Sequence, residues 1–499
     1  MMPKRFYILY PFCALLLGLI LSQILATLHV YLSNTRLYDS LTAITDAGYL
    51  AVPNSQVMSQ LHKFKTAFCG GLFFTFSIGS GISFLTLGCA WIWVRLFNRN
   101  KNLLYLFFVL WFALLVVLNI HGVIPIANLY FLVIPPAVFT AALWCMLHLR
   151  RQGINPKGTI HIVPLIILAI LLSWQIDNRM FTDFRDIFLL SNPVGSRINN
   201  FYYKYTLYPA EAFKSLDQKM LKTCRLEKIE SDATARSLEN ILINFDYIPI
   251  GGNKAVDLEA QQLNDGLLLK YRSNPILKIS FKEFFAHPDK AVREFSRKCD
   301  AYAFFRRFAF FSLLAGFPLA VYVIMHGLIS LVFSFFLSLR ISVVISSLLC
   351  FALGLFLMFS FHLERDQQIS VGNLEAALNA DQWQKRVAAL KRIDADNLDV
   401  KRFPTYPRLL TSPHIAERYW LVKTLANSQD PAAYKDLVAF LNDPQLNIRT
   451  MALYALGRMG NRQAIDQVLH ILETSDDWYI QWYAYRALRS LGWKQKKLN

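Results

Sequence analysis

Residues 443–460, DPQLNIRTMALYALGRMG, are echoed 32 positions later by residues 475–492, SDDWYIQWYAYRALRSLG. The two stretches carry the same apolar or small residues at equivalent positions. The matched pairs are Ile448 with Ile480, Ala452 with Ala484, Ala455 with Ala487, Leu456 with Leu488, and Gly460 with Gly492. A period of this length, with two short amphipathic helices per unit, is typical of an α-solenoid. Because one such unit cannot bury its own apolar face, the pattern predicts a stack of units.

Fainter copies of the unit precede the two clear ones. Arg386, Arg418 and Arg449 lie 32 and 31 residues apart, and an apolar residue follows each of them at the same offset. We therefore expect about four helix pairs between Val371 and Trp493.

This segment resembles a HEAT repeat domain, and the resemblance covers only the last quarter of the chain. It implies a binding surface for other proteins. It also implies that an acidic residue of one unit holds the arginine of the next, and Asp443 and Arg449 fit such a pair. Gln481 stands where the last unit would have its arginine. A minority of HEAT-like proteins are similar to lyase-type or hydroxylase-type enzymes, but the His-Glu metal motifs of those enzymes are missing from this sequence.

The rest of the chain is too apolar for an ordinary soluble protein, with 55% hydrophobic residues and a mean hydropathy of +0.32. Seven stretches have the roughly 17 to 25 apolar residues that a helix needs to cross a bilayer. They are Phe6 to Val30, Thr66 to Val94, Leu103 to Ile120, Val123 to Leu147, Ile160 to Ile176, Phe308 to Leu339 and Ile341 to Leu363. The first is too long for a signal-peptide core, so we interpret it as a retained span.

The formal charge of +18 raises the question of nucleic-acid binding. Residues 1–176 hold 11 Lys and Arg against 2 Asp and Glu, so half of the excess lies in short loops beside membrane helices. Residues 177–307 hold 21 against 17, and residues 364–499 hold 19 against 15. Neither soluble part has the concentrated basic face that phosphate binding needs, so nucleic acid is not an expected partner.

The same loop charges predict the orientation, because Lys and Arg are enriched in short cytoplasmic loops. With the N-terminus inside and seven spans, the insertion at 177–307 and the repeat domain at 364–499 both lie outside the cytoplasm. The critical segment is Phe308 to Arg340, since a re-entrant turn there would move the repeat domain to the cytoplasm. The basic residues at the predicted inner ends are Lys4, Arg5, Arg95, Arg99, Lys101, Arg150, Arg151, Lys157 and Arg340.

Cys224 and Cys299 are the only cysteines outside the predicted spans, and both lie in the insertion. In an oxidising compartment two such thiols commonly pair, so we expect a disulfide that closes a loop of about 75 residues. Two unrelated free thiols are the alternative. No Cys-x-x-Cys motif is present, so the sequence offers no haem-attachment or dithiol redox site.

The insertion is predicted to be a small α+β domain. GLLLKYR and ILKISF form strands around a turn at Ser273, Asn274 and Pro275, and Pro288 opens a helix. The aromatic stretch that runs from Phe201 to Tyr208 has two interpretations. It suits either the membrane-water boundary or an aromatic core under the small domain.

Trp478, Trp482 and Tyr485 are spaced i, i+4 and i+7, so they form one stripe on the last repeat helix. A terminal repeat needs a polar outer surface, and an aromatic stripe there needs a cover. The candidates are a partner protein, the insertion domain, the bilayer interface, or the basic tail with Trp493 folded back. We take the three aromatic residues as the predicted partner-binding site.

No phosphate-binding glycine loop, no nucleophile elbow and no zinc-protease helix occurs in the sequence, so we predict no catalytic residue, cofactor or metal. We expect a mainly α, multi-pass inner-membrane protein that uses a HEAT-like solenoid to organise other proteins of the cell envelope. The expected parts are five spans in 1–176, the insertion in 177–307, two spans in 308–363 and the solenoid in 364–499. Two alternatives stay open: a subunit of a membrane transport or lipid/polysaccharide export system, and an integral-membrane enzyme acting on a lipid-linked substrate.

Overall fold

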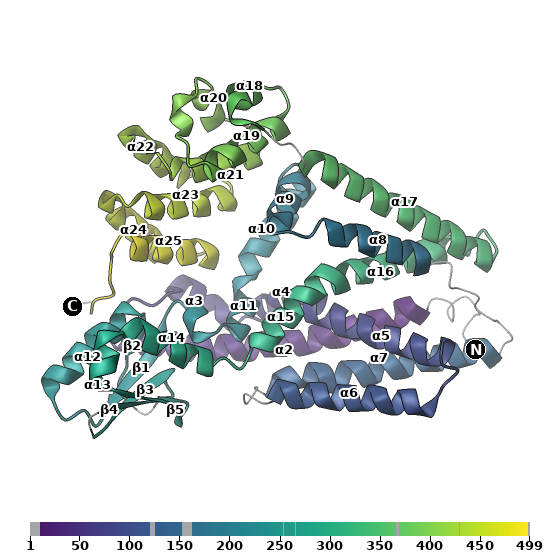
Figure 1. The fold of residues 1–499 in the computed structure, drawn as a ribbon, viewed down its shortest axis with the longest axis horizontal. Coiled ribbons are helices and arrows are strands. Elements are labelled where there is room, and N and C mark those ends of the chain that lie inside the picture. The colour runs from purple at the N-terminus through teal and green to yellow at the C-terminus, as the bar shows by residue number, and fades with distance from the viewer. Residues whose placement is uncertain are drawn as a thin grey trace.

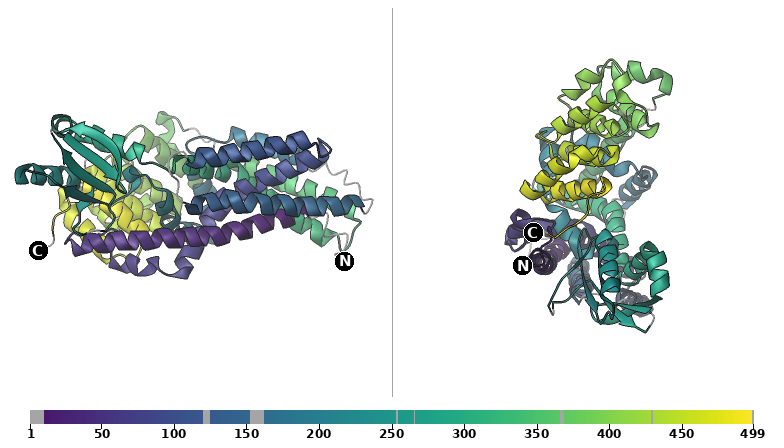
Figure 2. Two further views of the ribbon diagram at one scale, coloured as in Figure 1. Left: turned by 90° about the horizontal axis from the view of Figure 1, so that it is seen from below. Right: turned by 90° about the vertical axis from the view of Figure 1, so that its left-hand side faces the viewer.

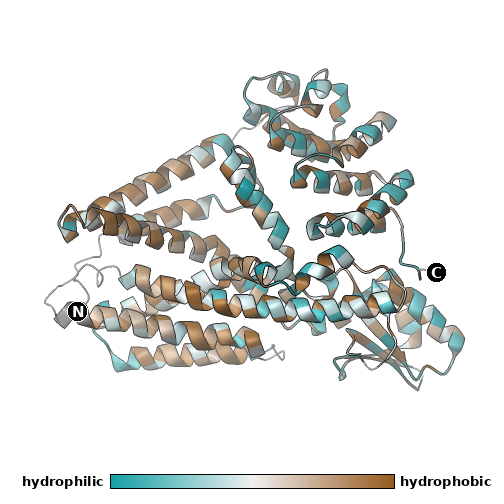
Figure 3. Cartoon of the chain, turned by 180° about the vertical axis from the view of Figure 1, so that it is seen from behind, coloured by the Kyte–Doolittle hydropathy of each residue, from teal (hydrophilic) through white to brown (hydrophobic). Residues whose placement is uncertain are grey.

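The computed structural model describes residues 10–119, 125–151, 162–252, 254–264, 266–365, 369–428 and 430–497. Within these ranges the fold is mainly helical and has three parts, as Figure 1 shows. Long apolar helices form one part, a five-stranded sheet with flanking helices forms the second, and a stack of short helix pairs forms the third. Hydrophobic residues predominate along the long helices, whereas the stack and the sheet domain are mixed (Figure 3).

Six helices in the described residues are long and apolar enough to cross a membrane. Seven spans were predicted, and the difference lies in Ile160 to Ile176. Its described part is the helix α8 (Ile162–Trp174), which has 13 residues, and residues 160 and 161 lie outside the described ranges. The six long helices are α2 (Tyr10–Asp46), α4 continued by α5 (Phe64–Phe74, Ser80–Arg95), α6 (Lys101–Asn119), α7 (Pro125–Arg151), α15 continued by α16 (Ala303–Phe311, Phe317–Phe333) and α17 (Leu339–Arg365).

Most of the predicted span Phe308 to Leu339 lies in one long helical segment from Ala303 to Phe333, and Leu339 already belongs to α17. A single π-helical turn at Ser312–Gly316 joins α15 to α16, and the chain then turns back into α17. The segment has no re-entrant turn. The predicted arrangement places the sheet domain and the solenoid on the same side of the membrane. It therefore requires this segment to cross the membrane once before α17 crosses back.

Two π-helical turns within the long apolar helices lie where small residues bring helices together. The first, at Thr75–Gly79, joins α4 to α5, and a Cβ atom added to Gly79 would stand 2.1 Å from Ser22 Oγ. One added to Gly81 would stand 2.1 Å from Ser312 Oγ, beside the second turn. Small residues at these crossings allow the backbones to approach, which is how helices pack in a lipid solvent.

The insertion domain contains a mixed sheet in the order β2-β1-β3-β4-β5. The central strand β1 (Lys222–Glu227) pairs in parallel with β2 (Tyr247–Pro249) and β3 (Leu258–Leu263). The strands β4 (Gly266–Tyr271) and β5 (Asn274–Ser280) extend it as the predicted hairpin. Three helices accompany the sheet: α12 (Asp232–Asn244), α13 (Phe281–Ala286) and α14 (Pro288–Lys298). The α+β prediction for this segment is confirmed.

Four helix pairs form the C-terminal stack, as the repeat period predicts. The first helices of the pairs are α18 (Leu374–Leu378), α20 (Tyr406–Leu410), α22 (Pro431–Phe440) and α24 (Ile465–Thr474). The second helices are α19 (Trp383–Ala395), α21 (Ile415–Leu425), α23 (Leu446–Met459) and α25 (Trp478–Ser490). The second helices pack on one another along the stack, and the apolar residues matched in the sequence, such as Ala452 and Ala484, are fully buried.

A chain of short helices joins the apolar helices to both soluble parts. It consists of α9 (Met180–Phe184), a π-helical turn at Arg185–Leu189, α10 (Pro193–Tyr205) and α11 (Leu207–Phe213). We call Met180–Phe213 the strut. It runs from the end of α8 past the solenoid to the sheet domain (Figure 1), and Figure 2 shows the two soluble parts at the same end of the molecule. The hydroxyl of Tyr485 in the solenoid donates a hydrogen bond of 2.5 Å to Asp246 in the sheet domain.

The predicted disulfide between Cys224 and Cys299 is not formed in the structure, where both are free thiols. Cys224 lies on the central strand β1 and is fully buried, and Cys299 packs against the same hydrophobic core from the end of α14. Burial raises the pKa of both thiols, that of Cys299 to about 12. Each sulfur fills apolar space in the core as a small hydrophobic side chain does, so pairing is not needed to place it there.

Membrane topology gives the first test. Because the sheet domain and the solenoid contact each other, a reporter enzyme active only outside the cytoplasm should give the same result after Asn253 and after Asn499. The loop charges predict that both fusions are active. Activity of one fusion together with silence of the other would contradict the contact between the two parts.

Thiol labelling gives the second test. In the folded protein Cys224 should resist alkylation, because it is fully buried and its pKa is raised. After unfolding without reductant, peptide mapping should find both Cys224 and Cys299 alkylated. If neither residue is alkylated until a reductant is added, the two are joined in a disulfide after all.

Candidate functional site

Arginines of successive repeats form a ladder of buried ion pairs along the solenoid. Arg386 donates to Glu417 Oε1 at 2.6 and 2.9 Å and to the carbonyl of Ala380 at 2.5 Å. Arg418 repeats the arrangement with Asp443 at 3.0 Å and the carbonyl of Ser412 at 2.5 Å. Each arginine therefore joins the loop before its own second helix to a carboxylate of the next repeat. A guanidinium suits this role because its fork of donors reaches several acceptors at once.

The predicted pair of Asp443 with Arg449 is wrong. Asp443 bonds to Arg418 of the preceding repeat, so the acidic residue reaches back along the stack and not forward. Gln481 takes the place of the arginine in the last repeat, and its amide keeps one of the ladder bonds by donating to the carbonyl of Ser475 at 2.6 Å. No further helix pair follows α25 among the described residues, and the Gln481 side-chain oxygen accepts a hydrogen bond from outside the stack.

The loop between α2 and α4 caps this open end of the solenoid. The backbone N–H of Asn54 donates to Gln481 Oε1 at 2.8 Å, and the Asn54 amide donates to the carbonyls of Leu472, Glu473 and Ser475 at 2.9 to 3.1 Å. The Asn54 side-chain oxygen also caps the short helix α3 (Ser55–Leu61). Gln495 of the tail donates to the carbonyl of Leu50 at 2.9 Å. The chain itself thus supplies hydrogen-bond partners to several polar groups at the end of the stack.

The strut lies along the second helices of the solenoid and contributes three buried polar residues, Asp183, Asp186 and Asn199. Asp186, with 1% of its surface exposed, accepts a hydrogen bond from Trp420 Nε1 at 2.7 Å and forms ion pairs with Lys391 at 3.2 Å and Arg185 at 2.7 Å. Farther along, the amide of Asn199 donates to Asn447 at 2.7 Å. These contacts fix the solenoid to the end of the apolar helices.

Arg185 adds a second set of contacts at this junction. Its guanidinium stands 3.9 Å from the centre of the Tyr419 ring. Burial opposes its charge, but Asp186 and Tyr419 hold its pKa well above the usual value. A desolvated cation between a carboxylate and an aromatic face is a strong contact, so this side of the solenoid is occupied by the strut.

Two of the three predicted partner-binding aromatics are covered by the chain itself. Trp478 packs edge-on against Tyr208 of the strut, at 4.9 Å between ring centres. Tyr485 bonds to Asp246 and packs against Trp493 of the tail. The strut, the insertion domain and the tail together form this cover, and an insertion-domain cover and a folded-back tail were two of the alternatives for the stripe. Tyr208 of the aromatic stretch packs against the solenoid and belongs to a different hydrophobic cluster from the core of the sheet domain, so neither interpretation of that stretch included this contact. Trp482 is the one that stays partly exposed.

The contact of Tyr485 with Asp246 is also electrostatic. Burial raises the pKa of Asp246, against the pull of Arg489 and the Tyr485 hydroxyl. Burial, followed by the nearby carboxylate, raises the pKa of Tyr485 well above its usual value. The hydroxyl therefore stays protonated and keeps donating.

Four aromatic and basic residues on the second helices α23 and α25 stay exposed or partly exposed. We call Tyr454, Arg458, Trp482 and Arg486 the aromatic-basic patch. Tyr454 is 37% exposed and lies at the position of its repeat that Arg486 takes in the next. The Arg486 guanidinium stands 4.5 Å from the centre of the Trp482 ring. Arg458 lies one turn after Tyr454, so all four share one side of α23 and α25.

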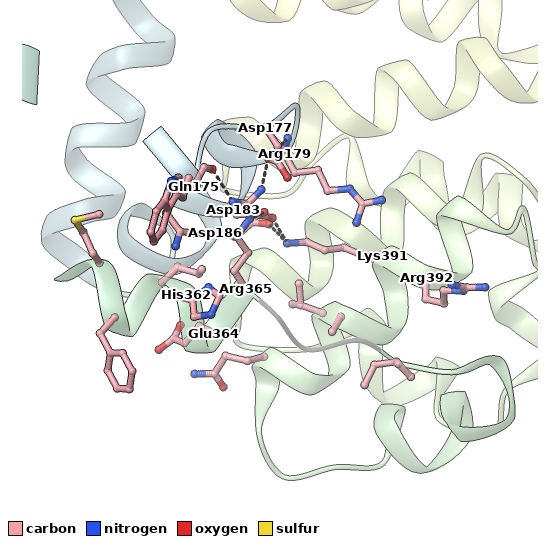
Figure 4. Close-up of a pocket in the computed structure, with 18 of the residues that line it drawn as sticks. Gln175, Asp177, Arg179, Asp183, Asp186, His362, Glu364, Arg365, Lys391 and Arg392 are labelled. Carbon is pink, nitrogen blue, oxygen red and sulfur yellow. Dashed lines mark hydrogen bonds and ion pairs between the residues drawn. The ribbon is translucent and has the colours of Figure 1, made fainter. Parts of the chain in front are cut away.

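A cavity of about 1240 Å³ lies where α8 and α17 meet the strut and α19. A charged network forms one wall, shown in Figure 4. Arg365 donates to Asp183 at 2.9 Å and to the carbonyl of Gln175 at 2.7 Å, and it also pairs with Asp177. Lys391 bridges Asp183 at 2.8 Å and Asp186. Apolar side chains of α8 and α17 form the opposite wall, namely Leu171, Trp174, Leu355, Met358 and Phe359.

Few features of the sequence predict this cavity. The insertion has 17 acidic residues, and a solvated surface is the default expectation for Asp183 and Asp186, yet both are buried. Their spacing of three on a helix was the available signal, because it places both carboxylates on one side. Among the described residues no group of three or more His, Cys, Asp and Glu is placed to hold a metal ion.

Comparison with known proteins supports the repeat assignment. Residues 404–489 match the family of HEAT repeats, which confirms the resemblance in the C-terminal region. The chain has no significant match among curated proteins or among solved structures. Proteins built from such repeats use the extended surface of the solenoid for binding.

The capping loop gives a third test. Asn54→Ala removes a helix cap and leaves the carbonyls of Leu472 and Glu473 without their donor, so unfolding should cost about 1 to 3 kcal/mol less. Hydrogen exchange should speed up in residues 472–481 and in α3 together. Asn442→Ala is the matched control, because Asn442 is exposed and its side chain has no partner among the described residues. Equal exchange in both variants would show that the loop does not cap the stack.

Proposed function

We propose that this protein is an integral membrane scaffold that holds another protein of the cell envelope against its HEAT-like solenoid, outside the cytoplasm. The observation that carries the proposal is the rigid attachment of a HEAT solenoid to the end of six apolar helices. The strut, the capping loop and the sheet domain all bond to it. A solenoid without a binding role would not need to be held in place by three separate parts of the chain.

The aromatic-basic patch is the surface we assign to the partner. Tyr, Trp and Arg are the residues that most often dominate binding energy at protein interfaces. Trp482 and Arg486 already stack on each other, so little side-chain freedom is lost when a partner covers them. The two arginines favour an acidic partner segment.

Co-purification in mild detergent provides the test. Arg458→Ala combined with Arg486→Ala should weaken binding by about 2 kcal/mol or more for each anchoring arginine, enough to remove the partner during washing. The amounts of co-purifying proteins are measured by mass spectrometry, with thermal unfolding to show that the variant is folded.

Arg408→Ala combined with Lys435→Ala is the matched control. It removes the same charge from exposed positions of the first helices α20 and α22. If the folded patch variant keeps every protein that the unchanged chain brings down, the patch is not the binding site.

A further inference from the structure

The helix α10 of the strut carries large apolar side chains on one exposed sector. They fall within an arc of about 100° around the helix axis, and between 42% and 66% of the surface of each residue is exposed. We call these residues the apolar arc: Val194, Ile198, Phe201 and Tyr202. Single exposed hydrophobic residues are normal on a soluble surface, but a continuous group of four marks a surface that is covered in use.

The rest of α10 is polar or already in contact with the solenoid. Asn199 is buried on the side that faces the solenoid, where it bonds to Asn447. Arg197, Asn200 and Lys204 are exposed on the remaining side, next to the apolar arc. A helix with an apolar sector beside a sector that carries basic residues is typical of helices that lie in a membrane surface.

The strut is attached to three of the long helices at the same end. At its beginning, Arg365 at the end of α17 bonds to α9 at 2.9 Å, and the ring of Phe181 lies 6.1 Å from that of Phe310 in α15. At the end of α10, the ring of Tyr202 lies 6.4 Å from that of Phe73 in α4. Figure 1 shows α10 between these attachments, running across the direction of the long helices. The helix therefore lies along the plane of a membrane that the long helices cross.

These attachments lie close to the expected membrane boundary. Phe64–Arg95 has 32 residues and is about 48 Å long, so a centred helix extends about 9 Å beyond each side of a hydrocarbon core of about 30 Å. Phe73 lies about 14 Å from the start of this helix. Ala303–Phe333 has 31 residues and extends by about 8 Å, and Phe310 lies about 10 Å from its start. Both contacts are thus a few ångström below the boundary, which is the depth of an interfacial helix.

We propose that α10 is an interfacial helix that inserts its apolar arc into the surface of the bilayer, between the phospholipid head groups and the acyl chains. The side chains of Arg197 and Lys204 extend to the lipid phosphates, and neither forms an ion pair with a described residue. The same helix holds the solenoid through Asn199, so it fixes the distance of the solenoid from the membrane. This anchor does not depend on the proposed scaffold role.

Photo-cross-linking identifies what covers the apolar arc. The full-length protein is reconstituted in vesicles of phosphatidylethanolamine and phosphatidylglycerol, with p-benzoylphenylalanine in place of Phe201 or, as the control, of Asn200. Both positions are exposed on the same helix, but only the first lies in the apolar arc. Mass spectrometry should find about ten-fold more phospholipid adduct on the first peptide. Equal adducts at the two positions would overturn the proposal, as would cross-links from the first probe to a second copy or another protein without any lipid adduct.

A pair of charge substitutions tests insertion without a probe. In vesicles, Ile198→Asp should increase hydrogen exchange in residues 193–205 about ten-fold, because a carboxylate is costly in the apolar boundary. Asn200→Asp adds the same charge on the polar side and should leave exchange unchanged. An exposed residue in water tolerates either change. Equal exchange in the two variants would show that the apolar arc faces water, which contradicts insertion.

Discussion

Two buried carboxylates, Asp183 and Asp186, join the apolar helices to the solenoid. A carboxylate out of water is costly unless charges and hydrogen bonds surround it. Here the compensation comes from three different parts of the chain: Arg365 at the end of α17, Lys391 in the first repeat and Trp420 in the second. Because no single part can satisfy these carboxylates, the strut is stable only where the membrane helices and the solenoid are both in place.

The network of ion pairs around these carboxylates fixes the relative position of the helices more than it stabilises the fold. Replacing the whole network by apolar side chains of similar volume is often neutral for stability. Removing only one partner leaves a buried charge unpaired, at a cost of about 3 to 5 kcal/mol. The network therefore holds α17 and α19 in one relation. The cavity beside it keeps its shape for the same reason, since the side chains that form its polar wall are bonded to one another.

The sequence predicts the parts of this fold better than their assembly. Apolar runs identify the long helices because crossing a bilayer needs length and low charge, and the 32-residue period identifies the repeats because equivalent residues are buried in each. The pairing direction of the arginine ladder was predicted wrongly, because Asp443 lies close in sequence to Arg449 but points back to Arg418. The cover of Trp478 and Tyr485 comes from residues 208 and 246, and no local pattern records such distant contacts. The cavity has the same origin, since its walls come from four separate segments.

The bond between Asn54 and Gln481 joins residues that are 427 positions apart. The capping loop is synthesised with the first helices and must wait for nearly the whole remaining chain before its partner exists. During that time its polar groups and the apolar residues Val52 and Val57, which end fully buried, have no native cover. Folding of this protein cannot finish from the N-terminus onward, because its last repeat completes its first loop. A chain that stops short of the last repeat therefore has a defect in its first loop as well, and quality-control factors could recognise it there.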